Sequence, residues 1–206
     1  MRLIGILDYG IGNVGSIRNM LKKAGCESSI VYDAAALAAC DKLILPGVGA
    51  FDEGMDRLDK SGMRQALDTA VTTGKPVLGI CLGMQMLGLS SEEGKCEGLG
   101  YIPFRNIRFR LQDQPGLKVP HMGWNYVTIK HEPDPIVRGV SEPPRYYFVH
   151  SYHAQCDNQA DVLMLCEYGY SFVAAVRHGN VWGTQFHPEK SHRFGMSLLK
   201  NFAEVC

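Results

Sequence analysis

The sequence lacks the features that mark membrane-spanning, disulfide-rich and nucleic-acid-binding proteins. No apolar run approaches the length needed to cross a bilayer, and no charged segment followed by a long apolar stretch opens the chain. The seven cysteines form no Cys-x-x-Cys pair and are odd in number, which disfavours both a disulfide framework and a zinc site. Lys plus Arg and Asp plus Glu both number 21, so no excess charge points to nucleic acid or an anionic membrane. We therefore expect a cytoplasmic protein without a bound metal.

What the chain does contain is enough apolar sequence for one sizeable core. Its 206 residues are 46% hydrophobic and 20% charged, which fits a single globular domain over residues 1–206. The first half alternates short apolar strands with helical patterns, an order that favours a parallel sheet, and the second half is mostly β-patterned. We predict an α/β fold with a central, mostly parallel twisted sheet, flanking helices and a smaller antiparallel β portion in the C-terminal half.

The patterns divide the chain into strands and helices. The predicted strands cover residues 2–7, 29–32, 42–45, 77–80, 99–102, 107–111, 124–129, 146–149, 162–167, 172–177 and 181–186. The predicted helices cover residues 16–24, an Ala-rich segment after Asp33, and residues 51–58, 63–71, 82–89 and 191–205.

A strand that turns abruptly into a helix carries the clearest chemical signal. Cys81 stands between the apolar run 77–80 and the helical run 82–89, flanked as Gly79-x-Cys81-x-Gly83. This is the thiol version of the nucleophile elbow, whose turn is so tight that only glycines fit beside the central residue. Such a turn exposes the thiol at the carboxyl end of the sheet, where the helix N-terminus stabilises a thiolate. On its own, the pentapeptide leaves a buried structural cysteine almost equally plausible.

A histidine near the end of the chain could act as the matching base. His187 follows the apolar strand 181–186, and Pro188 forces a turn directly after it because proline cannot continue a strand ladder. Glu189 can fold back to the imidazole and fix its tautomer. A supported imidazole of this kind is what a cysteine nucleophile needs as its base. Without Cys81, the same tripeptide would be better explained as a surface turn.

Two glycine-rich loops each allow two interpretations. Gly10-x-Gly12-x-x-Gly15 follows a strand and matches the dinucleotide fingerprint, with Asp33 close to the expected spacing of ~20 residues. An NAD(P)-binding oxidoreductase is therefore an alternative, although the rest of a two-half dinucleotide fold is missing from this short chain. The Pro-Gly-Val-Gly-Ala-Phe segment at 46–51 could aim backbone N–H groups into a crevice, or it could be a plain strand-to-helix turn.

Three separated motifs together resemble those of the class I (triad) glutamine amidotransferases. They are residues 46–49, 79–85 and 185–191, and the resemblance covers essentially the whole chain. It implies the single-domain class I glutamine amidotransferase fold. It also implies hydrolysis of L-glutamine to glutamate and ammonia by the triad Cys81, His187 and Glu189, without a cofactor.

Accessory motifs resemble one branch of that family, the glutaminase subunits of imidazole glycerol phosphate synthases. They lie at residues 8–13, 46–51, 121–125 and 147–152. This resemblance implies a heterodimer with a cyclase subunit, a (β/α)₈ barrel. The barrel receives the ammonia through a channel and makes imidazole glycerol phosphate and aminoimidazole carboxamide ribotide in histidine biosynthesis. The alternative within the family is an amidotransferase subunit for anthranilate, aminodeoxychorismate or pyridoxal phosphate synthesis.

The same resemblance implies the remaining site residues. The oxyanion hole would be formed by backbone N–H groups from Leu82, Gly47, Val48 and Gly49. The glutamine headgroup would be held by Gln85, Ser151, Tyr152 and Glu93, with the adjacent Glu92 equally able to meet its ammonium group. The cyclase would be faced by Tyr9, Gly10, Asn13 and Lys190.

Overall fold

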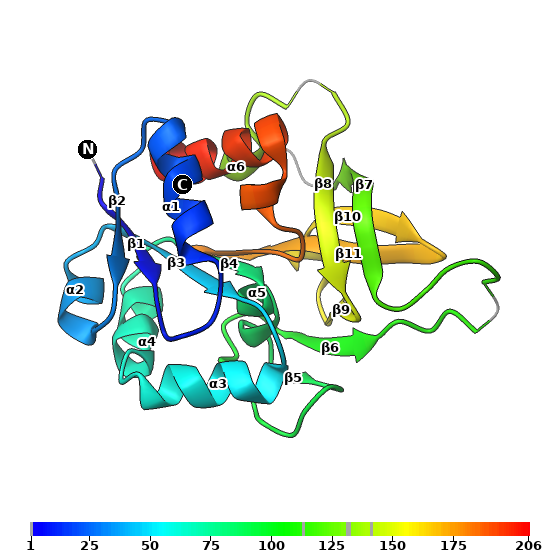
Figure 1. Ribbon diagram of the computed structural model, residues 1–206, viewed down its shortest axis with the longest axis horizontal. Coiled ribbons are helices and arrows are strands. Elements are labelled where there is room, and N and C mark those ends of the chain that lie inside the picture. Colours follow the sequence, from blue (N-terminus) through cyan, green and yellow to red (C-terminus); the bar gives the residue numbers. More distant parts are fainter. Residues whose placement is uncertain (1, 113, 131–132, 141) are drawn as a thin grey trace.

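A mixed sheet with helices on both faces of its parallel half forms the framework of the molecule (Figure 1). The structure, a computed structural model, describes residues 2–112, 114–130, 133–140 and 142–206. The parallel strands lie in the order β2 (Ser28–Val31), β1 (Ile4–Leu7), β3 (Lys42–Gly47), β4 (Val77–Cys81) and β12 (Val181–Thr184). The carboxyl ends of β3, β4 and β12 therefore lie side by side.

The sheet continues beyond β12 with antiparallel strands from the second half of the chain. These are β11 (Tyr170–His178), β10 (Val162–Tyr168), β7 (His121–Ile129) and β8 (Arg145–His150). A branch leaves the sheet at β11 and contains β9 (Tyr152–Cys156), β6 (Phe104–Arg108) and the short β5 (Ser90–Ser91). The predicted α/β arrangement, mostly parallel first and antiparallel later, is confirmed.

Helices cover the parallel half on both sides (Figure 1). One face carries α1 (Val14–Lys23) and α6 (His192–Val205). The other carries α2 (Ala34–Ala38), α3 (Phe51–Lys60), α4 (Arg64–Thr72) and α5 (Leu82–Met86). Three short 3₁₀ turns complete the elements: η1 (Pro135–Val137), η2 (Gln159–Asp161) and η3 (Pro188–Lys190).

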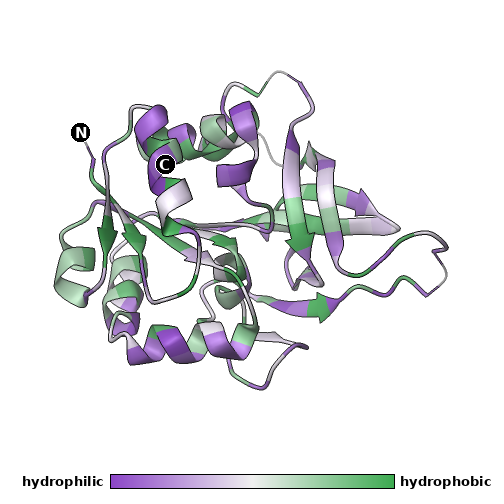
Figure 2. Ribbon diagram, viewed as in Figure 1, coloured by the Kyte–Doolittle hydropathy of each residue, from purple (hydrophilic) through white to green (hydrophobic). Residues whose placement is uncertain are grey.

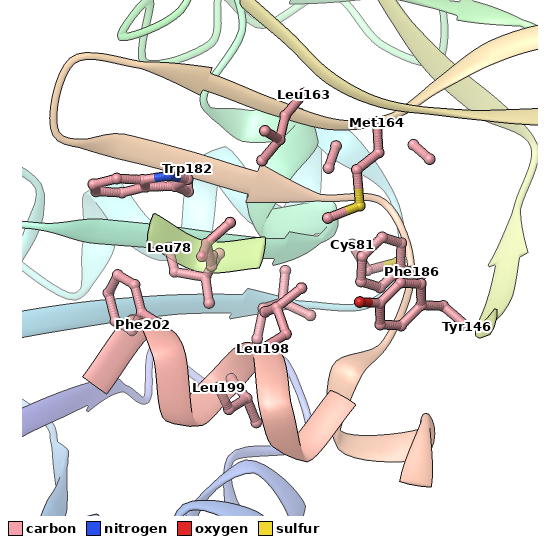
Figure 3. Close-up of a cluster of buried hydrophobic side chains, with 14 of the residues drawn as sticks. Leu78, Cys81, Tyr146, Leu163, Met164, Trp182, Phe186, Leu198, Leu199 and Phe202 are labelled. Carbon is pink, nitrogen blue, oxygen red and sulfur yellow. The ribbon is translucent and has the colours of Figure 1, made fainter. Parts of the chain in front are cut away.

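Alternate residues of the parallel strands form two separate cores, one on each face. Ile44 and Leu78 pack toward α1 and α6, whereas their neighbours Leu43 and Val77 pack toward α3, α4 and α5. Figure 3 shows Leu78 among Leu198, Leu199 and Phe202 of α6. Because both faces are covered, the central strands β1 and β4 are continuously apolar. The outer helix α3, in contrast, is largely hydrophilic (Figure 2).

Several of the predicted elements differ from the structure. Residues 99–102 form no strand, since Gly100 has φ +69° and the chain bends there before β6 begins at Phe104. The helix predicted over 82–89 ends at Met86. The prediction also missed β9, whose sequence Tyr-His-Ala-Gln-Cys lacks a strong apolar alternation. In the described part of the chain, no helix has both the length and the apolarity that a membrane span requires.

Candidate active site

Cys81 occupies a strained turn between β4 and α5. Its φ is +56° and its ψ is −110°, in a region that side-chain-bearing residues rarely adopt. Among the described non-glycine residues only Cys81 and His192 have positive φ. The surrounding structure must hold this conformation against a cost of ~1–3 kcal/mol, which is typical of positions where geometry matters more than stability.

The two glycines that flank Cys81 are required for space, because neither has positive φ. A Cβ on Gly83 would lie 1.9 Å from the Leu45 carbonyl oxygen, and one on Gly79 would lie 2.7 Å from the Gly83 carbonyl oxygen. These contacts pack the turn directly against the end of β3. The register pairs Gly47 with Cys81, so the loop after β3 begins beside the thiol.

His187 and Glu189 form a buried pair next to the thiol. His187 Nδ1 lies 2.8 Å from Glu189 Oε1, and each side chain is only 2% exposed. Because a carboxylate accepts, Nδ1 carries the proton and Nε2 is left for other chemistry. Nε2 is buried and has no hydrogen-bond partner among the described residues.

The imidazole of His187 strongly favours its protonated form. Burial lowers the pKa of His187, but contact with Cys81 and the hydrogen bond to Glu189 outweigh it and raise the pKa to about 10. The charges of both neighbours add to this effect. His187, which lies between the thiol and the carboxylate, is therefore protonated at neutral pH.

The thiol faces a cavity of about 340 Å³. It is lined by Val48, Gly49, Cys81, Leu82, Gln85, Glu93, Pro120, Val149, His150, Ser151, Tyr152 and His187. Nine of these twelve residues are predicted site residues. Although Cys81 is only 7% exposed and packs against the apolar cluster of Figure 3, its sulfur is accessible from this cavity. A larger hollow of about 440 Å³ between α2 and α4 is lined mainly by Ala and Thr and contains no comparable set of reactive groups.

Two neighbouring glutamates, equivalent in the sequence, take different places. Glu93 lines the cavity and accepts a hydrogen bond from the Phe51 N–H at 2.8 Å. Glu92 instead accepts from the backbone N–H of Arg108 and pairs with Arg110 at 2.9 Å, outside the cavity lining. Of the two predicted candidates for a ligand ammonium group, the structure brings only Glu93 to the thiol.

Glu93 belongs to a reciprocal clamp between its own loop and α3. The N-cap residue of α3, Ala50, has no side-chain acceptor. The carboxylate of Glu93, which is remote in the sequence, therefore accepts from the first N–H of the helix. In return, Asp52 of α3 accepts from the backbone N–H groups of Lys95 and Cys96, at 2.9 Å and 3.0 Å. These hydrogen bonds lower the pKa of Asp52 and tie the Glu93 loop to the loop that follows β3.

The glycine-rich loop after β1 packs against the loop after β3. Gly10 and Gly12 have φ of +85° and +105°, and a Cβ on Gly12 would lie 3.1 Å from Pro46. Tyr9 is buried, and its hydroxyl donates to the Pro46 carbonyl at 2.5 Å. Positive φ and close packing thus explain Gly10 and Gly12 without a dinucleotide, whereas Gly15 lies in α1 with open space around it.

The four predicted interface residues divide into two groups. Gly10, Asn13 and Lys190 are exposed. Tyr9, in contrast, is 6% exposed and supports the Pro46 loop from within, so the structure does not support a surface contact through its side chain.

The sequence reasoning missed two features of this region. Gln185 is fully buried, with its amide Nε2 3.9 Å from the Cys81 sulfur. The second feature is a surface stripe on β7 that consists of Met122, Trp124 and Tyr126, which are 62%, 39% and 59% exposed. Exposed large side chains at every second position of a strand are the signal that could have identified this stripe.

The other cysteines differ from Cys81 in their surroundings. Loss of hydration raises the pKa of six thiols, and a nearby carboxylate adds to the effect in each case. The six are Cys26, Cys40, Cys96, Cys156, Cys166 and Cys206. None of the six lines the cavity of Cys81.

A thiol on a strained strand-to-helix turn, with a carboxylate-supported imidazole just after the neighbouring strand β12, is the arrangement that cysteine-dependent acyl transfer requires. The glutamine amidotransferase class-I family model matches residues 5–206, and the chain belongs to that family. The predicted fold is confirmed, and the oxidoreductase alternative is not supported.

Two relatives place the chain more narrowly. "Imidazole glycerol phosphate synthase subunit HisH 2" of Pseudomonas aeruginosa is 50% identical over 98% of this chain and 100% of its own length. "Imidazole glycerol phosphate synthase subunit HisH" of Leptospira interrogans is 45% identical with the same coverage. A Thermotoga maritima chain from a solved structure of PurLQS shares the fold, with a TM-score of 0.77, 19% identity and 98% coverage of both chains.

Proposed function

We propose that this chain is the glutaminase subunit of an imidazole glycerol phosphate synthase and provides ammonia for histidine biosynthesis. The observation that carries the chemistry is that Cys81 and His187 line one cavity, with Glu189 bonded to the imidazole, although more than a hundred residues separate the thiol from the other two. The choice of pathway rests on relatives that are 45–50% identical over nearly their whole length. Subunits of the anthranilate, aminodeoxychorismate and pyridoxal phosphate pathways are the second candidates.

In the proposed reaction, the Cys81 sulfur attacks the side-chain amide carbon of glutamine. The backbone N–H of Leu82 and one from the loop 47–49 stabilise the oxyanion, and loss of one such donor typically costs ~3 kcal/mol. His187, which holds a proton at neutral pH, passes it to the departing nitrogen as the C–N bond breaks. A water molecule then attacks the γ-glutamyl thioester while His187 takes its proton, the C–S bond breaks, and the site returns to its starting state with the proton on His187. Glutamate and ammonia are the products.

The cavity also suggests how glutamine is recognised. Glu93 offers a carboxylate to the ammonium group, while Ser151 and Tyr152 line the opposite wall. Both amide hydrogens of Gln85 are committed to protein acceptors, at the Tyr152 carbonyl and at Gln185 Oε1. Gln85 can therefore offer only its own Oε1, an acceptor, and we propose that this oxygen also meets the ammonium group.

We propose that the β7 stripe, together with Gly10, Asn13 and Lys190, docks the (β/α)₈ cyclase subunit. Exposed aromatic and Met side chains are typical of protein interfaces. Arg145 lies over the rings of Trp124 and Tyr126, 5.3 Å and 5.7 Å from their centroids, and holds them in place. The balanced charge supports neither nucleic acid nor a membrane as a further partner, and we expect the complex to act in the cytoplasm.

A Cys81→Ala variant of the complex tests the chemistry. We expect glutamine-dependent synthesis to be lost while synthesis from added ammonium salt continues, because only the release of ammonia needs the thiol. Cys96→Ala, which removes an exposed cysteine outside the cavity, should behave like the wild type in both assays. Glutamine-dependent turnover by Cys81→Ala would refute the proposed nucleophile.

A Trp124→Ala variant tests the docking surface. Truncation of an interface hot spot costs ~2 kcal/mol, so the dissociation constant for the cyclase subunit should rise roughly thirtyfold. Tyr32, 64% exposed near β2 at the opposite end of the sheet, gives the control Tyr32→Ala, which should bind normally. Equal affinities in titration calorimetry would exclude the stripe as the docking surface.

A further inference from the structure

A buried amide touches the Cys81 sulfur and has no part in the reaction described above. Gln185 follows β12, two residues before His187, and is 0% exposed. Its Nε2 lies 3.9 Å from Cys81 Sγ, and its Oε1 accepts a hydrogen bond from Gln85 Nε2 at 3.1 Å. Gln185 thus links the sulfur to a residue of the glutamine-binding wall.

The direction of these hydrogen bonds is fixed at the backbone carbonyl of Tyr152. This carbonyl can only accept, and the Gln85 amide atom that faces it, at 3.3 Å, must therefore be the NH₂ group. The second hydrogen of that group reaches Gln185 Oε1. Gln185 consequently presents its own NH₂ group, a donor, to the sulfur. The orientation of both amides therefore follows from the Tyr152 carbonyl, which can only accept a hydrogen bond.

Two buried histidines hold that carbonyl in place. His150 Nδ1 lies 2.8 Å from the Tyr152 oxygen and must carry a hydrogen, which leaves its Nε2 as an acceptor for His121 Nδ1 at 3.0 Å. Burial lowers the pKa of His121 to about 4 and that of His150 to about 3, so both rings are neutral at physiological pH and keep these tautomers. The Tyr152 carbonyl thus accepts from two directions.

A donor next to the sulfur favours the charged form of the nucleophile. Hydrogen bonds to ionised groups are roughly twice as strong as those between neutral groups, so the Gln185 N–H interacts more strongly with a thiolate than with a thiol. We propose that Gln185 is a catalytic residue that donates to the Cys81 thiolate, with the direction of its amide set by the chain Tyr152 carbonyl–Gln85–Gln185. The proposal rests on the proposed role of Cys81 as the nucleophile.

Other groups that face the sulfur remain unchanged when Gln185 is replaced. His187 stands on one side, and Tyr9 on another, where burial and the charge of Cys81 raise the pKa of its phenol far above the ordinary value. Glu93 is the carboxylate that lines the same cavity, and Glu189 acts through His187. A change in thiol reactivity on substitution of Gln185 therefore reports on the amide itself.

The test is the pH dependence of Cys81 alkylation by iodoacetamide, read by mass spectrometry of the Cys81 peptide. Gln185→Met removes the donor at similar volume, and Gln185→Glu replaces it with an oxygen while keeping an acceptor for Gln85. In both, the pH midpoint should rise by about one unit, and kcat/KM for glutamine in the cyclase complex should fall about tenfold with KM little changed. Gln155→Met, on the exposed face of β9, should match the wild type.

The outcomes separate the two proposals. If the midpoint and kcat/KM of a folded Gln185→Met variant coincide with those of the wild type, Gln185 is only a packing residue and this inference is wrong. If Gln185→Met does not fold, the same comparison on Gln185→Leu, which also removes the donor and adds no charge beside the sulfur, decides. Failure of the proposed nucleophile would appear separately, as glutaminase activity that survives in Cys81→Ala.

Discussion

A methyl group on Gly83 should separate the two strands that carry the site. In Gly83→Ala the new Cβ would lie 1.9 Å from the Leu45 oxygen and 2.8 Å from its carbonyl carbon, whereas real Cβ contacts are essentially never below 3.0 Å. The obstructing atoms belong to the backbone of β3, paired in register with β4, so no side-chain rotation relieves the clash. Relief requires β3 to move away from the Cys81 turn and to carry the loop 47–49 with it.

The size of the effect follows from this geometry. Overpacking of a core costs about 1–3 kcal/mol. The Gly83 clash belongs at the upper end, because the new Cβ meets backbone atoms of β3 that cannot rotate away. About 3 kcal/mol corresponds to a fall in Tm of roughly 6–12 °C for a chain of this length. The assays are thermal unfolding by circular dichroism and glutaminase activity below the new Tm, which should also fall because the oxyanion donors move.

Gly15→Ala is the matched control. Gly15 lies in α1, its φ is not positive, and a Cβ there would meet nothing within 4 Å. Alanine should therefore leave Tm unchanged or raise it slightly, since glycine in a helix costs ~0.5–1 kcal/mol relative to alanine. A Gly83→Ala protein with a wild-type Tm and full activity would refute the spatial explanation of the Gly-x-Cys-x-Gly motif.

Three further predictions follow from the charged groups. Glu189→Gln should lower the pKa of His187 from about 10, because the carboxylate no longer supports the imidazolium, and nitrogen NMR of the ring measures the shift. Burial lowers the pKa of His121 to about 4 and that of His150 to about 3 in the folded protein, against an ordinary 6.5. The stability that the neutral rings contribute is therefore complete above pH 6.5 and is lost as the pH falls toward 4. Urea unfolding should give a lower free energy of unfolding at pH 5 than at pH 7.5. Asp52→Ala should raise KM for glutamine severalfold with kcat less affected, since it releases the loop that positions the ammonium site.

For each of these three predictions, one experimental result would refute the reasoning. An unchanged His187 titration in Glu189→Gln would refute the role of the carboxylate in raising the pKa of His187. If His121→Phe, which removes one of the two imidazoles, left the loss of stability between pH 7.5 and pH 5 as large as in the wild type, the histidine explanation would be wrong. Asp56→Ala, on the exposed face of α3, is the control for Asp52, and equal KM values for the two variants would remove the clamp from the explanation.

The parallel strands and the thiol turn were predictable because their signals are local. A strand buried on both faces is a short apolar run with few alternatives, and a cysteine between two glycines at its end indicates a tight turn. The sequence predicted a turn so tight that only glycines fit beside its central residue. In the structure Cys81 itself adopts the positive φ, and the two glycines give room to neighbouring backbone.

What could not be predicted depends on pairing between distant segments. Glu92 and Glu93 are chemically identical, and only the position of Arg110 across the branch of the sheet and of Phe51 at the start of α3 separates them. Gln185 opens one of the three family-like motifs, but a single amide at the end of an apolar strand does not reveal that Cys81 and Gln85 meet it there. Contacts of this kind are set by strand register, which local patterns do not encode.

The contrast between Cys81 and the six other thiols has a practical consequence for covalent inhibitors. At neutral pH the raised pKa values keep those six sulfurs in the weakly nucleophilic S–H form, including Cys96, which solvent reaches most easily. An electrophile mild enough to require a thiolate would therefore react poorly with those six sulfurs. A small reagent of modest reactivity, shaped to pass the mouth of the Cys81 cavity, should label one position in a chain that offers seven.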